Sequence, residues 1–219
     1  DELAAAGDGN VAALARAAGA GNVERAAELV DDGVGVNTAL PGGSCVALHF
    51  ASVEGRADVV AWLVERDADV EGGTREGGAT PLYLAARYGH AAAARRLLEG
   101  GADASRAEPG GRSPLWKACY GGYFEAARAL VEGGADVGQV NGKGAPPLKM
   151  ACQNGHVDVA RMLIEKDADV GQADNRGAAP LLMACVNGHV DVARLLIEAG
   201  ADVTQAWNGR TPLAIATHQ

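Results

Sequence analysis

The chain has 219 residues, of which 48% are apolar and 31 are glycines, and its formal net charge is −9. This composition provides enough apolar material for a sizeable or extended core, and it excludes disordered and collagen-like chains. The acidic excess argues against broad binding to a nucleic acid backbone, and no apolar run approaches the roughly 20 residues that a membrane span needs.

Residues 1–40 are predicted to form a capping unit, after which the sequence repeats at a nearly constant interval. Leucines recur with successive spacings of 34, 34, 33, 33, 33 and 32 residues, and glycines keep the same register. Segments 147–173 and 180–206 differ at only six of 27 aligned positions. Such self-similarity is typical of a stack of structural repeats. The leucines are Leu14, Leu48, Leu82, Leu115, Leu148, Leu181 and Leu213, and the glycines are Gly21, Gly55, Gly89, Gly122, Gly155 and Gly188.

Each repeat is predicted to contain two helices. The first begins at a signal such as Thr80-Pro81-Leu82, in which the threonine hydroxyl caps the helix and the proline takes its first position. The register glycine then turns the chain, and a second helix follows, as in residues 157–164. Because the chain ends after a single helix of its last unit, we interpret it as a fragment of a longer protein, with an unusually short cap as the alternative. Five full units are expected at 41–74, 75–107, 108–140, 141–173 and 174–206, followed by a truncated unit at 207–219.

Some units depart from this pattern at their helix ends. Val46, Pro146 and Ala179 stand where Thr80 stands in the third unit, so three first helices lack a capping hydroxyl, which typically stabilises a helix by ~1 kcal/mol. We expect these units to fray first. At the end of the second helix, glycines of Gly-Ala-Asp steps are natural left-handed caps. Asp67 and Asp167 replace that glycine in two units, in a conformation that aspartate tolerates only moderately.

The repeat resembles the ankyrin repeat family. Thr80-Pro81-Leu82-Tyr83-Leu84-Ala85 and residues 211–216 match the family's Thr-Pro-Leu-His-x-Ala signature, and three Gly-His steps match its turn. The resemblance covers essentially the whole chain and implies a single domain, an all-α repeat solenoid of helix-turn-helix units with β-hairpin-like finger loops. It also implies that the histidines bond backbone between units. The residues assigned a structural role are Leu82, Gly89, His90, Leu115, Gly155, His156, Gly188 and His189.

No catalytic, cofactor or metal site is expected. Cys119, Cys152 and Cys185 occupy one position of successive units, and helices 8–10 Å apart cannot bring such sulfurs to disulfide or zinc distance. We interpret them as buried free thiols, consistent with a reducing compartment. The glycine-rich stretch 138–144 is one residue short of a P-loop and has no Ser or Thr after its lysine. The sequence therefore predicts that the protein is not an enzyme.

Aromatic and cationic residues gather in the middle of the chain. Three Trp, four Tyr and two Phe make nine aromatic residues, and six of them lie between 83 and 124. The family binds partners through finger tips and the exposed side of the first helix, and Trp, Tyr and Arg dominate binding hot spots. Core filling is the alternative role for Tyr83, Trp116 and Phe124. The predicted partner-binding residues are Arg87, Tyr88, Arg112, Trp116, Tyr120, Lys143, Lys149, Gln153, Asn154, Arg176 and Trp207.

Lys117 is the oddest residue of this group, because it stands where other units carry Phe50, Leu84, Met150, Met183 and Ile215. It must either extend along apolar surface or face an acidic partner.

The resemblance and the cluster together predict a non-catalytic protein–protein interaction module. We expect a monomer that holds an acidic or amphipathic protein or peptide segment in its concave groove and fingers, with no nucleic acid or membrane partner. An engineered ankyrin-type binder or scaffold, and the targeting domain of a larger enzyme or channel, are the alternatives. The amino-terminal segment lacks the basic-then-apolar order of a secretion signal, so we expect an intracellular, cytoplasmic protein, with the nucleus as a second location.

Overall fold

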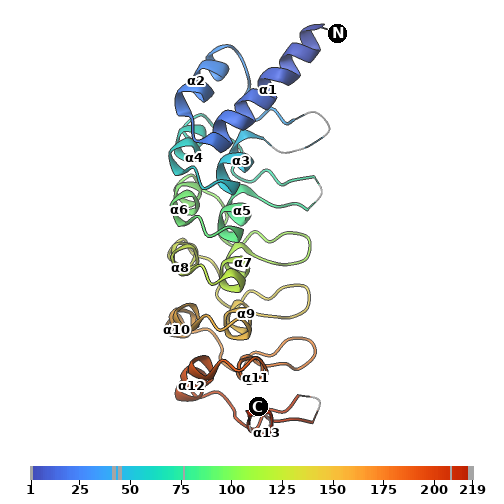
Figure 1. Cartoon of the computed structure of the whole chain (residues 1–219), viewed down its shortest axis with the longest axis vertical. Coiled ribbons are helices and arrows are strands. Elements are labelled where there is room, and N and C mark those ends of the chain that lie inside the picture. Colours follow the sequence, from blue (N-terminus) through green and yellow to red (C-terminus); the bar gives the residue numbers. More distant parts are fainter. Residues whose placement is uncertain (1, 41–42, 44–45, 76, 208, 217–219) are drawn as a thin grey trace.

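The computed structural model describes residues 2–40, 43, 46–75, 77–207 and 209–216. Its helices come in pairs, one pair for each expected unit, and the last unit contributes a single helix (Figure 1). The predicted all-α repeat solenoid is therefore confirmed. The helices are α1 (Glu2–Ala20), α2 (Val23–Asp31), α3 (Ala47–Val53), α4 (Ala57–Val64), α5 (Pro81–Arg87), α6 (Ala91–Glu99), α7 (Pro114–Gly121), α8 (Phe124–Glu132), α9 (Pro147–Gln153), α10 (Val157–Glu165), α11 (Pro180–Val186), α12 (Val190–Glu198) and α13 (Pro212–Ala216).

The helices form two columns. The odd-numbered helices pack on one another in chain order and form the first-helix column. The even-numbered helices, from α2 to α12, form the second-helix column in the same way. Loops project beside the first-helix column, and we call them fingers (Figure 1). Among the described residues, fingers are closed by backbone bonds such as Asn141 N–H to the carbonyl of Ala145 (3.1 Å) and Asp174 N–H to that of Ala178 (3.2 Å). Within the described residues the fingers form no extended strand, and Trp207 and Arg210 make an isolated β-bridge.

Hydroxyl groups cap the first helices where the sequence supplies them. The side-chain oxygens of Thr80, Ser113 and Thr211 each accept a hydrogen bond, 3.2 Å long, from a backbone N–H of the first turn. Val46, Pro146 and Ala179 make no side-chain cap bond. The first helices therefore differ as predicted: some begin with a capping hydroxyl and three do not.

The left-handed positions also follow the sequence pattern. Asp67 and Asp167 have φ angles of 57° and 62°, and they are the non-glycine residues with positive φ among the described residues. They stand where other units place a glycine cap, as predicted. Elsewhere the second helix ends at glycines such as Gly134, whose φ is 90°.

The main core is one continuous cluster that runs the length of the stack, and two small clusters around Tyr83 and Trp116 lie apart from it. The repeating leucines from Leu14 to Leu181 lie inside the main cluster, and so do the leucines eight residues after each register glycine. Each buried leucine contributes about 1.5–3 kcal/mol before the entropy of folding is subtracted. A single helix pair could not bury these side chains, so every unit depends on its neighbours. The buried leucines of the two series are Leu14, Leu48, Leu82, Leu115, Leu148 and Leu181, and Leu29, Leu63, Leu97, Leu130, Leu163 and Leu196.

Histidine bonds join one unit to the next. Nε2 of His90 donates to the carbonyl of Val53 (2.8 Å), and Nε2 of His189 donates to that of Gln153 (3.1 Å). Nε2 of His156 donates to the carbonyl of Tyr120 (3.2 Å). These are the inter-unit bonds that the family resemblance implies.

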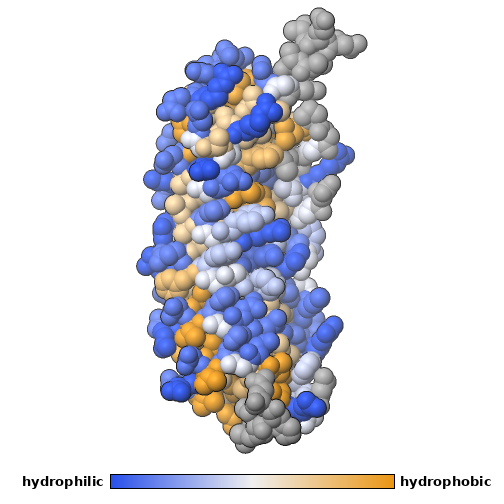
Figure 2. Space-filling model, viewed as in Figure 1, coloured by the Kyte–Doolittle hydropathy of each residue, from blue (hydrophilic) through white to orange (hydrophobic). Residues whose placement is uncertain are grey.

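The last described helix pair has an exposed apolar side. Among the described residues α13 packs on α11, but on the side of α12 away from α10 no helix packs, and Val190 and Ile197 are 67% and 51% exposed. With Leu181, Val203 and Pro212 they line an apolar pocket of about 620 Å³. Figure 2 shows hydrophobic surface gathered toward this lower end of the molecule.

Candidate functional site

The centre of the predicted surface is an aromatic pair on α7. The rings of Trp116 and Tyr120 stack with centroids 5.6 Å apart and planes 7° from parallel. Nε1 of Trp116 donates to the carbonyl of Ala145 in the next finger (3.1 Å), and its side chain is buried. Tyr120 is 48% exposed. Trp116 thus fills space between units and stacks on Tyr120, whose ring is half-exposed.

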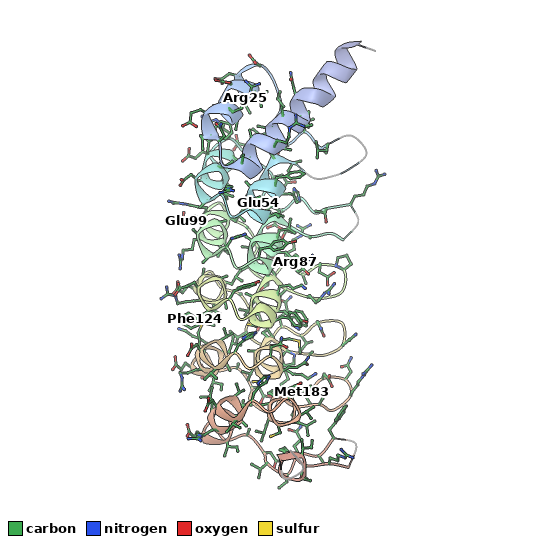
Figure 3. All side chains as sticks on the ribbon, viewed as in Figure 1. Arg25, Glu54, Arg87, Glu99, Phe124 and Met183 are labelled. Atoms are coloured by element: carbon green, nitrogen blue, oxygen red, sulfur yellow. The ribbon has the colours of Figure 1, made fainter. Side chains whose placement is uncertain are left out.

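Two cationic side chains adjoin exposed rings. Nζ of Lys117 lies 5.9 Å from the ring centroid of Trp116 and 5.5 Å from that of Tyr120. The guanidinium of Arg87 lies 5.4 Å from the ring of Tyr88, a half-exposed residue that ends α5. Figure 3 places Arg87 at the first-helix column, whereas Glu99 and Phe124 lie along the second-helix column. The exposed rings and cations therefore share the side that carries the fingers.

A pocket of about 490 Å³ adjoins this pair, between two fingers and the first-helix column. Its lining combines apolar side chains with amide, cationic and acidic ones, and the acidic side chain, Asp174, comes from the following finger. Five predicted binding residues meet here although 41 residues separate the first from the last. The predicted residues that line the pocket are Arg112, Trp116, Lys143, Lys149 and Gln153, and Gly110, Asn141, Ala145, Met150 and Asp174 complete it.

Two of these cations are already paired within the chain. Nε and Nη2 of Arg112 donate to the two carboxylate oxygens of Glu108 at 2.7 and 3.1 Å. This bond holds the pKa of Glu108 below its usual value. Nζ of Lys149 donates to Oδ2 of Asp174 at 2.6 Å, and the two side chains are only 7% and 11% exposed. Lys149 is therefore buried in an ion pair, which is not the open position that its sequence context suggested.

The remaining predicted residues are spread along the fingers and helix ends. Nδ2 of Asn154 donates to the carbonyl of Tyr120 (2.9 Å), so its amide joins two units. Lys143 and Arg176 are exposed on successive fingers, and within the described residues neither is in an ion pair. Trp207 is half-buried in the last finger, away from the pocket.

Sequence reasoning missed the two acidic partners. Glu108 precedes Arg112 by four residues in the same finger, a spacing that could have revealed the pair. Asp174 is 25 residues from Lys149 and lies in the following finger. The sequence signal for Asp174 was its position in the repeat. Glu108, Asn141 and Asp174 are separated by one repeat each and begin equivalent fingers.

The surface holds a net positive charge on an acidic chain. Lys117 is half-buried and, in the described part of the chain, lies in no ion pair. Burial lowers the pKa of Lys117, and the neighbouring charges of Arg112 and Arg87 lower it further. The charged form of Lys117 is thus less stabilised than that of a lysine in water, and a nearby anion would stabilise it.

The three described cysteines are not bonded to one another. Cys119 and Cys152 are buried and Cys185 is half-buried, and all three are free thiols. Burial raises the pKa of Cys152 to about 12 and also raises that of Cys119. Among the described residues no group of three or more His, Cys, Asp or Glu side chains could hold a metal ion.

Comparisons with known proteins agree with this geometry. The sequence pattern of ankyrin repeats, in three copies, matches residues 71–141 and 148–219. The structure is similar to the crystal structure of the human ASB11 ankyrin repeat domain, with a TM-score of 0.83 and 30% sequence identity over 93% of this chain and 90% of that one. A comparison with curated protein sequences gave no significant match. No described helix is long and apolar enough to cross a membrane.

Proposed function

The chain belongs to the ankyrin repeat family, and from this premise we propose that it is a non-catalytic module that binds a protein or peptide segment. The binding surface lies on α5, α7 and α9 and on the fingers at 108–112 and 141–145. Ankyrin repeats are generally protein–protein interaction modules, so the family supports the class of function. The place of the surface rests on this chain's own residues.

One observation carries the proposal. Exposed aromatic rings and unpaired cations occur together on one side of an otherwise acidic stack. Tyr88 and Tyr120 are 44% and 48% exposed, and Arg87 and Lys117 lie beside these rings without an acidic partner among the described residues. Large rigid rings and cations are the groups that contribute most to protein interfaces. An acidic or amphipathic segment is the complementary partner.

We propose the same organisation for the domain as the repeat pattern predicts. It comprises a capping unit at 1–40, five full repeats at 41–206 and a truncated repeat at 207–219. The helix pairs fall within these limits, which supports the division. We further propose that the chain is a monomer in an intracellular compartment.

A triple substitution tests the placement of the surface. Partners captured by the wild-type chain and identified by mass spectrometry are titrated with Arg87→Ala/Tyr88→Ala/Tyr120→Ala. All three side chains are exposed, so the fold is expected to persist. We expect affinity to fall at least about tenfold, since a hot-spot side chain typically contributes more than 1 kcal/mol.

The control is Arg161→Ala/Arg194→Ala, which removes two exposed cations from the second-helix column. It is expected to leave affinity within about twofold, as surface substitutions outside an interface do. Equal affinity of the triple variant and the wild type would refute the placement. Loss of binding in the control alone would move the surface to the second-helix column.

A further inference from the structure

Building on the proposed function, we infer that Lys117 and Arg87, together with the rings of Trp116 and Tyr120, form a subsite for a single carboxylate side chain of the partner. The subsite lies on the outward side of α5 and α7, next to the pocket between the fingers. It selects an aspartate or glutamate that neighbours an apolar residue.

The repeat itself provides the first argument. Leu84, Lys117 and Met150 are each one repeat apart on successive first helices. Leu84 and Met150 are 8% and 6% exposed, so this position is a nearly closed apolar slot. In both neighbouring units an apolar side chain fills this position. Lysine at this position therefore adds a charge that the stack does not need for packing.

The surroundings of Lys117 provide the second argument. Its ammonium group lies beside two aromatic rings, at 5.9 and 5.5 Å from their centroids, and such contacts stabilise a cation only modestly. Glu108 is the acidic group whose field acts on Lys117, but both its oxygens accept bonds from Arg112. Arg112 and Arg87 also repel Lys117. The positive charge thus lacks a counter-ion within the described residues.

These features favour a carboxylate on a peptide segment. A carboxylate can accept hydrogen bonds from both Lys117 and Arg87, and charge-assisted bonds in a partly desolvated site are stronger than neutral ones. The exposed ring of Tyr120 offers an apolar contact to the neighbouring residue. An extended polyanion such as a nucleic acid would be repelled by the rest of the chain, whose net charge is −9.

The test uses a library of random 12-residue peptides displayed on phage, selected against the wild type, Lys117→Glu and Lys166→Glu. Lys166 is an exposed lysine that follows α10, so its variant has the same net charge as Lys117→Glu. We expect the wild type and Lys166→Glu to enrich peptides with Asp or Glu beside an apolar residue. Lys117→Glu should lose that preference and enrich Lys or Arg instead.

One enriched peptide, made synthetically, then gives the affinity. Lys117→Met should weaken its binding about tenfold, the effect of losing one charged hydrogen bond of about 1.4 kcal/mol. The same variant should raise the urea midpoint of unfolding, because methionine fills this slot in the next unit. A purely structural lysine would not give a more stable protein that binds less tightly.

The outcomes separate the subsite from the proposed function. Enriched peptides that lose binding in the Tyr88→Ala/Tyr120→Ala variant but show no preference for Asp or Glu would refute the subsite and leave the proposed function intact. Unchanged affinity of Lys117→Met for an acidic peptide would do the same. Peptides that bind equally well to Tyr88→Ala/Tyr120→Ala would refute the proposed function and the subsite with it.

Discussion

Replacing Gly122 with alanine is expected to lower the free energy of unfolding by about 2–4 kcal/mol. Gly122 follows α7 with a φ of 72°, a left-handed conformation that costs alanine about 1 kcal/mol or more. A Cβ atom there would also overlap the imidazole ring of His156 from the next unit. Since that ring bonds the carbonyl of Tyr120, the substitution disturbs the contact between two units.

Gly134→Ala is the matched control. Gly134 has a φ of 90°, but a Cβ atom there would meet nothing within 4 Å. Gly134→Ala introduces only the backbone strain of alanine at a positive φ, so it should lower the free energy of unfolding by about 1 kcal/mol. Urea unfolding followed by circular dichroism measures both variants. Equal losses for the two glycines would mean that the His156 ring does not hold the units together as described.

Asp174→Asn is expected to lower the free energy of unfolding by about 3 kcal/mol at neutral pH. The amide keeps the shape of the carboxylate but removes its charge, and Lys149 is left buried without a counter-ion. Burying an unpaired charge is costly, and Lys149 is only 7% exposed on its side chain. Denaturant unfolding of the single variant measures this cost.

A second substitution should restore most of the loss. Leu182 occupies the position of Lys149 in the next unit, and Asn141 occupies that of Asp174 in the preceding finger. Oδ1 of Asn141 accepts from Lys143 N–H (2.9 Å) and Ala145 N–H (3.0 Å), the same turn that Oδ1 of Asp174 makes. Lys149→Leu/Asp174→Asn should therefore lie within about 1 kcal/mol of the wild type. A double variant as unstable as the single one would contradict the role of the ion pair.

The pH dependence of the same variants gives an independent check. Burial alone raises the pKa of Asp174, but hydrogen bonds from Lys149, Ala178 and Arg176 outweigh it and hold the pKa below the ordinary 3.8. A lowered carboxyl pKa means that the folded chain binds fewer protons than the unfolded one. The stabilisation is complete above pH 3.8 and is lost as the pH falls through the lower folded value. The difference between wild type and Asp174→Asn should shrink over that window.

The repeat pattern predicted a stack of helix pairs, and the resemblance to the ankyrin repeat family supplied the solenoid with finger loops. A leucine that recurs every 33 or 34 residues can be buried only if equivalent helices stack, because one helix pair has no interior of its own. The same register predicted the cap at Thr80 and the strained positions of Asp67 and Asp167. Helix caps and left-handed backbone positions depend on residues close in sequence, so they can be predicted from the local sequence.

The details of the site depend on contacts between units, and those could not be predicted. Lys149 was expected at the open surface because its helix has an exposed side, but the neighbouring finger folds Asp174 over it. Asn154 was expected to face a partner, yet its amide donates to the carbonyl of Tyr120. In both cases a side chain from one unit meets a group one unit away, and the periodic pattern does not reveal that meeting.

The central claim is that partners bind beside α7, on the side of the fingers, and the indole N–H signals of the three tryptophans test it most directly. Trp116 lies at the claimed surface and Trp62 lies on α4 in the second-helix column, with Arg66 stacked 4.2 Å from its ring centroid. Titration of ¹⁵N-labelled chain with a captured partner is predicted to shift the Trp116 signal and leave Trp62 unchanged. A shift of Trp62 with Trp116 unmoved would contradict the account.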